Sequence, residues 1–147
     1  FKGASNRLEL IQKTKNSAIY KDFAHSPSKL KATSAAMKKQ FKKRKLVACM
    51  ELHTFSSLTT SFLKEYAGCM DEPDIAIVYF NPEAIRHKKL NLITKDDIYR
   101  GFKRQDLLIY TDSEKLKNYL ESLNWDHQNL LLMSSGDFGS IEINNLL

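Results

Sequence analysis

The chain has 147 residues, with 23 Lys or Arg against 17 Asp or Glu, which gives a formal net charge of +6 at neutral pH. This length allows one domain with a core and is short for two, so we expect a single domain over residues 1–147. With 42% hydrophobic and 27% charged residues, the composition excludes a disordered or collagenous chain. Two cysteines exclude a disulfide framework, and no apolar run approaches the ~18 residues of a membrane span. We expect no signal peptide, no membrane contact and a cytoplasmic location.

The chain opens with the pattern of a β-hairpin. Apolar residues recur among polar ones over 7–14 and again over 17–23, and Lys and Asn at 15–16 suit a tight turn between them. Ser26 then precedes a proline, an order typical of a helix start. Serine is a favoured N-cap residue, and proline is well tolerated at the first helical position. We expect this helix to cover 27–40.

The rest of the chain alternates between continuous apolar runs and helical patterns. Such runs predict strands that are buried on both faces, and Thr94 and Thr111, each followed three residues later by an acid, predict helix starts. Alternation of this kind predicts an α/β fold: a Rossmann-like, mostly parallel sheet flanked by helices, with the N-terminal hairpin added. Residues 81–92 are expected to be an irregular loop. The expected strands are 46–50, 75–80, 107–110 and 130–133, and the expected helices are 58–66, 95–102 and 113–123.

Missing motifs limit the chemistry. The chain has neither a G-x-x-x-x-G-K-[ST] phosphate loop nor a G-x-G-x-x-G fingerprint. Its four histidines are far apart in the sequence, so we expect no metal site. The basic runs 38–45 and 86–89 fit either an anionic ligand or a solvated face. Phe41 is the one aromatic residue among these basic residues, too few for a stacking platform, so we expect no nucleic-acid binding.

Ligands of open α/β sheets lie beyond the carboxyl ends of the strands, so the segments that follow the apolar runs are the candidates for a site. These segments are 51–57, 81–87, 111–113 and 134–140. A helix cap explains the serines of the first segment but leaves Glu51 and His53 unexplained. Asp22 and His25 precede a helix N-terminus, where they fit either a cap or an anion site.

Four stretches of the sequence resemble those of a known protein family. They are F-K-G-A-S-N-R-L-E at 1–9, D-F-A-H-S-P at 22–27, E-L-H-T-F-S at 51–56 and M-S-S-G-D-F-G-S-I at 133–141. Together they resemble the C-terminal domain of the Mur ligases, most of all the branch of UDP-N-acetylmuramate:L-alanine ligase and of Mpl, the L-alanyl-γ-D-glutamyl-meso-diaminopimelate ligase. The resemblance implies a fragment of a three-domain enzyme. That enzyme joins an amino acid or peptide to UDP-N-acetylmuramate through an acyl phosphate, with ATP and Mg²⁺ held mainly by the central domain. The isolated domain is then expected to be inactive.

The resemblance also implies roles for individual residues. Arg7 matches an arginine near the nucleotide phosphates and is the one catalytic candidate, Asp22 matches an aspartate that contacts the ATP ribose, and His25 falls on the same nucleotide side. The expected substrate-binding residues are His53, Ser57, Arg86, Ser134, Ser135, Asp137 and Phe138.

One departure from the family leaves the substrate open. Residues 51–60 contain no arginine, although relatives bind the substrate carboxylate with an arginine there, so we expect Arg86, Lys88 or Lys89 to supply the charge. The late loop 133–141 looks like that of Mpl, which favours the tripeptide as the incoming amine. The alternatives are an L-alanine ligase domain and a stand-alone Rossmann-like module that binds an anion.

Overall fold

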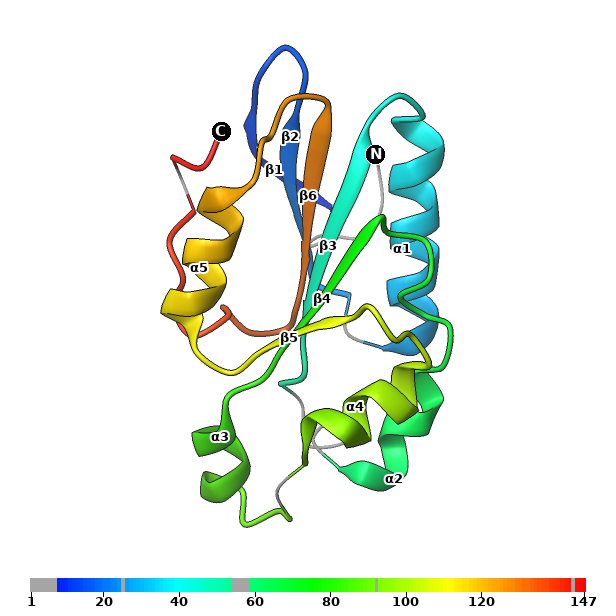
Figure 1. Cartoon of the computed structure of the whole chain (residues 1–147), viewed down its shortest axis with the longest axis vertical. Helices are drawn as coiled ribbons and strands as arrows, with labels where there is room; N and C mark the ends of the chain where they lie inside the picture. Colours follow the sequence, from blue (N-terminus) through cyan, green and yellow to red (C-terminus); the bar gives the residue numbers. More distant parts are fainter. Residues whose placement is uncertain (1–7, 25, 54–58, 92, 144) are drawn as a thin grey trace.

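The computed structural model describes residues 8–24, 26–53, 59–91, 93–143 and 145–147. In this part of the chain a six-stranded sheet has the order β1-β2-β6-β3-β4-β5, with only the β1–β2 pair antiparallel (Figure 1). The Rossmann-like α/β prediction, N-terminal hairpin included, is therefore confirmed. The elements are β1 (Glu9–Lys13), β2 (Ala18–Asp22), α1 (Pro27–Gln40), β3 (Lys45–Glu51), α2 (Thr60–Leu63), the 3₁₀ turn η2 (Lys64–Tyr66), β4 (Ile75–Tyr79), α3 (Pro82–His87), α4 (Lys95–Phe102), β5 (Leu108–Tyr110), α5 (Ser113–Ser122) and β6 (Gln128–Met133).

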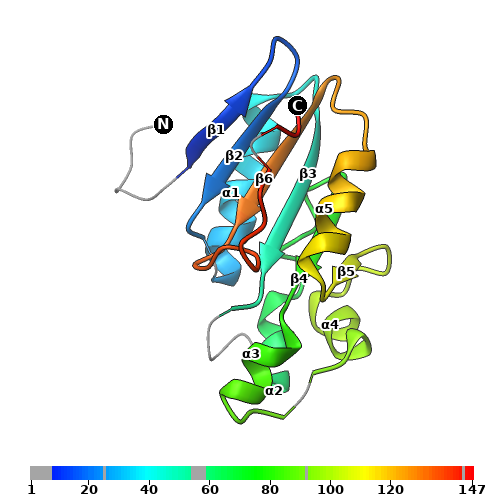
Figure 2. The same ribbon diagram turned by 90° about the vertical axis from the view of Figure 1, so that its left-hand side faces the viewer.

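Helices cover both faces of the sheet, as the alternation predicts. Figures 1 and 2 show α1, α2 and α4 on one face and α5 with the C-terminal segment on the other. The central strands alternate between the two: in β3, Ala48 and Met50 pack into the α1 side of the core, and Val47 and Cys49 into the α5 side. Successive side chains of a strand point to opposite faces, so this period decides the face of every residue at the strand ends.

Two local predictions are wrong. The expected loop over 81–92 contains a short helix, α3, whose N-cap Asn81 accepts a hydrogen bond from the backbone N–H of Glu83 at 2.9 Å. The cap of α5 is Asp112 rather than Thr111, because the Asp112 carboxylate accepts from the Glu114 N–H at 2.9 Å. The predicted capping box at Thr94 is present, and Ser26 stands at the N-cap of α1 but makes no capping bond with its side chain.

The α2 and α4 helices pack unusually closely. A Cβ added at Gly101 of α4 would lie 2.7 Å from the carbonyl oxygen of Leu63, at the end of α2. Only glycine permits this approach, and next to it the Tyr66 and Phe102 rings stack with centroids 4.8 Å apart. Among the described residues, no helix is long and apolar enough to cross a membrane.

Candidate functional site

Polar residues gather where β2, β6 and β3 end side by side. Asp22 ends β2, Glu51 ends β3 and Ser134 follows β6, and the Ser134 N–H donates to the Asp22 carbonyl at 3.1 Å. By strand alternation Asp22 lies on the α1 face, where it meets Thr33, whereas Glu51 lies on the α5 face with Ser134. These residues therefore belong to two clusters on opposite faces of one sheet edge.

The first cluster, the Asp22 cavity, lies between β2 and α1. Asp22 is only 7% exposed; one carboxylate oxygen accepts from the Ala24 N–H at 2.9 Å and the other from the Thr33 hydroxyl at 3.3 Å. Because each carboxylate oxygen has a second lone pair, Asp22 can still accept hydroxyl donors from a ligand. The cavity holds about 280 Å³ and is lined by Leu8, Asp22, Ala24, Lys29, Ala32, Thr33 and Ala36.

The residues of this cavity fit part of a nucleotide. Apolar Leu8 and the alanines offer a surface for a ring, Asp22 an acceptor for sugar hydroxyls, and Lys29 a cation for phosphate. The volume is close to the ~300 Å³ lower limit of ordinary ligand pockets, so a whole nucleoside triphosphate extends beyond it. No group of three or more His, Cys, Asp or Glu in the described chain could hold a metal ion.

The second cluster is built on Glu51, which is 4% exposed. One of its oxygens, Oε1, accepts from the Ser134 hydroxyl at 2.7 Å and from the Phe138 N–H at 3.0 Å. The other oxygen, Oε2, lies 3.6 Å from Nδ1 of His53, whose side chain is 46% exposed. The Gly136 N–H in turn donates to the Ser134 hydroxyl at 2.7 Å. Glu51 thus joins the residues after β3 to the loop 134–138 after β6.

The loop 134–138 and the turn after it are held in a strained shape. Phe138, Gly139 and Ser140 have φ of 55°, 70° and 64°, a left-handed run that a bulky residue such as phenylalanine rarely adopts. The Phe138 ring is 2% exposed and lies 6.1 Å from the Tyr79 ring, centroid to centroid. Burial first, and then the neighbouring Glu51 carboxylate, raise the pKa of Tyr79, so its phenol stays neutral.

The other predicted substrate residues differ in their surroundings. Asp137 is exposed and accepts from the Ser140 hydroxyl at 3.2 Å. The Ser135 hydroxyl oxygen is buried and has no hydrogen-bond partner in the described structure. Because the Phe138 ring is buried, its side chain supports the loop instead of facing solvent. Arg7, His25 and Ser57 lie outside the described residues.

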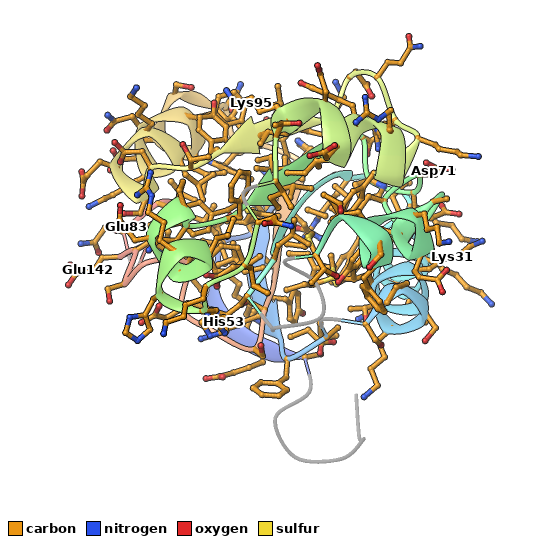
Figure 3. The ribbon with its side chains drawn as sticks, turned by 90° about the horizontal axis from the view of Figure 1, so that it is seen from below. Lys31, His53, Asp71, Glu83, Lys95 and Glu142 are labelled. Atoms are coloured by element: carbon orange, nitrogen blue, oxygen red, sulfur yellow. The ribbon has the colours of Figure 1, made fainter. Side chains whose placement is uncertain are left out.

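Of the three basic candidates, Lys88 is the one that a hydrogen bond brings to the site: its ammonium donates to the His53 carbonyl at 3.3 Å. Arg86 instead pairs with Glu83, one turn earlier on the exposed surface of α3. Figure 3 looks onto this end of the molecule, with His53 beside the helix that carries Glu83. The sequence pattern gave no sign of Lys29 or Thr33, which enter the site only because α1 packs along β2.

An open, mostly parallel sheet with polar clusters at the carboxyl ends of its strands is the arrangement in which α/β domains bind ligands. The family model described as Mur ligase, glutamate ligase domain matches residues 6–136. The chain belongs to this family, as the resemblance implies.

A curated relative agrees with this membership, and two solved structures share the fold. The chain is 36% identical over 119 residues to UDP-N-acetylmuramate–L-alanine ligase of Caldicellulosiruptor bescii, a match that covers 81% of this chain and 25% of the relative. It superposes on the murein peptide ligase Mpl of Psychrobacter arcticus with a TM-score of 0.70 at 20% identity, over 100% of this chain and 32% of that one. For the UDP-N-acetylmuramate–alanine ligase MurC of Thermotoga maritima the TM-score is 0.65 at 14% identity, over 92% and 27%. The chain therefore spans about a quarter of the curated relative's length.

Proposed function

We propose that this chain is the C-terminal domain of a longer, three-domain cytoplasmic enzyme that uses ATP to join an amino acid or peptide to UDP-N-acetylmuramate. The observation that carries the proposal is the pair of clusters at one sheet edge in a chain of the Mur ligase family. The Asp22 cavity suits part of a nucleotide. On the other face, the loop 134–138 offers the groups that meet the incoming amine.

In this proposal ATP supplies the phosphoryl group that activates the muramoyl carboxylate, and ATP and Mg²⁺ are held mainly by the central domain. Asp22 accepts the sugar hydroxyls of the nucleotide, and Arg7 neutralises charge at its phosphates. His53, Ser134, Ser135 and the backbone around them position the amine. Such division of a site between domains makes catalysis depend on domain closure, so the isolated 147-residue chain should be inactive.

The incoming amine has two candidates. The late loop M-S-S-G-D-F-G-S-I supports the tripeptide L-alanyl-γ-D-glutamyl-meso-diaminopimelate through its likeness to Mpl. Relatives at 36% and 33% identity are named L-alanine ligases, which supports free L-alanine. We favour the tripeptide, and its additional carboxylates would find a cation in Lys88.

The test is an assay of phosphate release by the longer protein with ATP, UDP-N-acetylmuramate and each amine in turn. We expect turnover with the tripeptide and at least tenfold lower kcat/KM with L-alanine. Strict preference for L-alanine would show that the proposed substrate is wrong, but the proposed ligase activity would stand. No turnover with any amine would favour the alternative function, a Rossmann-like module that binds an anion. The affinity of such a module for its ligand should fall steeply with added salt.

A further inference from the structure

We infer that Glu51 is the positioning residue of this site, which fixes the strained loop 134–138 in the shape that binds the incoming amine. The inference rests on the proposed function for the role of the loop. The sequence pattern leaves Glu51 without an assigned role, and its contacts supply one.

The first step is that one oxygen of Glu51 holds the loop at both ends. Oε1 accepts from the Ser134 hydroxyl at 2.7 Å and from the Phe138 N–H at 3.0 Å. A carboxylate that is 4% exposed is costly unless such bonds satisfy it. Bonds to an ionised acceptor are also stronger than neutral ones. The loop and the buried carboxylate therefore stabilise each other.

The second step is that the loop needs this support. Phe138 has φ of 55°, a conformation that costs free energy and persists only where its surroundings impose it. Strained residues of this kind are common at functional sites, where they pre-organise the backbone in the conformation that binds the ligand. Gly136 fits closely under the same carboxylate, since a Cβ there would lie 2.9 Å from Glu51 Oε1.

The third step is that the held loop presents an unused group. The Ser135 oxygen is buried and unpaired in the described structure, and an unsatisfied buried hydroxyl is unfavourable until a partner arrives. Ser135 lies between Ser134, whose hydroxyl donates to Glu51, and Gly136, whose N–H donates to that same Ser134 hydroxyl. A polar group of the incoming amine substrate is the partner that the proposed function supplies.

The test separates geometry from charge with three variants of the longer enzyme. Glu51→Gln keeps an Oε1 acceptor without the charge. Glu51→Asp keeps the charge, but its shorter side chain places the carboxylate one methylene group nearer the backbone. Glu51→Ala removes both the acceptor and the charge. We expect Glu51→Ala and Glu51→Asp to raise the KM for the amine about tenfold, the loss of one or two hydrogen bonds. Glu51→Gln should stay within threefold of the parent. The KM values for ATP and UDP-N-acetylmuramate should not change, and Glu72→Gln, at an exposed position, is the matched control.

A general-base role predicts the reverse order, in which Glu51→Gln and Glu51→Ala lose kcat equally and Glu51→Asp keeps part of it; that order would overturn the inference. So would an unchanged amine KM in Glu51→Ala. Amide hydrogen exchange of the 147-residue chain gives a readout without turnover. The Phe138 amide should exchange about tenfold faster in Glu51→Ala and Glu51→Asp than in Glu51→Gln. If the parent enzyme itself is inactive, the proposed function fails; if it is active and Phe138 exchange does not respond, only the role of Glu51 fails.

Discussion

Replacing Gly136 with alanine tests how firmly the loop after β6 sits on the end of β3. The new Cβ would lie 2.9 Å from Glu51 Oε1 and 3.1 Å from Cδ2 of His53. His53 is half exposed and can rotate away, but Glu51 is buried and bonded. The backbone of the loop therefore has to move away from the carboxylate.

The magnitude follows from the bonds that this movement stretches. Relieving a 2.9 Å contact takes a shift of several tenths of an ångström, which lengthens the bonds of 2.7 and 3.0 Å that Ser134 and Phe138 donate to the same oxygen. Weakening hydrogen bonds to a charged acceptor costs about 2 kcal/mol. In a domain of this size that corresponds to a fall in Tm of about 6 °C.

The assay is urea and thermal unfolding of the chain carrying Gly136→Ala, Glu51→Ala or both. Because Glu51→Ala removes the atom that the new methyl group meets, adding Gly136→Ala to it should cost less than about 0.5 kcal/mol. The two substitutions should thus be strongly non-additive. A Tm within 1 °C of the parent for Gly136→Ala, or additive losses in the double variant, would refute the close fit described above.

Three further outcomes follow from other parts of the structure. Gly101→Ala should lower the free energy of unfolding by about 1–2 kcal/mol in urea, although alanine is the better helix former, because its methyl group meets the backbone of α2. Burial raises the pKa of Asp74, but the Lys38 ammonium and a backbone N–H outweigh it and leave the pKa lowered. The stabilising effect of the ionised Asp74 should be present above the pKa of the unfolded chain and be lost as the pH falls through the folded pKa. Asp74→Asn should therefore destabilise less in acid than at pH 7, and an equal loss of stability at both ends of an acid titration would contradict the pairing with Lys38. In the longer enzyme, Lys88→Ala should raise the KM for the amine at least threefold and Arg86→Ala should not, and equal effects of the two would contradict the placement of Lys88 beside the site.

The sheet could be predicted because its evidence is local. Each of the central strands is a continuous apolar run, and such runs occur where both faces are buried. The α3 helix escaped prediction because six residues are too few to show a helical period. Its only signal was the Asn81–Pro82 pair, a cap followed by a residue suited to the first turn.

The candidate site was predictable only in part, because its members meet through tertiary packing. Strand ends drew attention to Glu51 and Ser134, and a helix start drew attention to Asp22; all three lie at the carboxyl edge of the sheet. Their division between two faces depends on β6 lying between β2 and β3, which no local pattern encodes. Thr33 is 11 positions away from its partner Asp22, and Lys88 reaches His53 from a helix that the sequence pattern did not show.

The place of β6 in the sheet has a consequence for synthesis on the ribosome. β6 is the last strand described and pairs with both β2 and β3, so the N-terminal hairpin has no parallel partner until residues 128–133 have left the exit tunnel. Until then β3, β4 and β5 can assemble, while the hairpin and its edges stay open to other chains. The two clusters of the candidate site are joined in the same late step, since the Ser134 N–H bonded to Asp22 follows directly after β6. Assembly of the site and completion of the fold are thus a single event, timed by the C-terminal part of the chain.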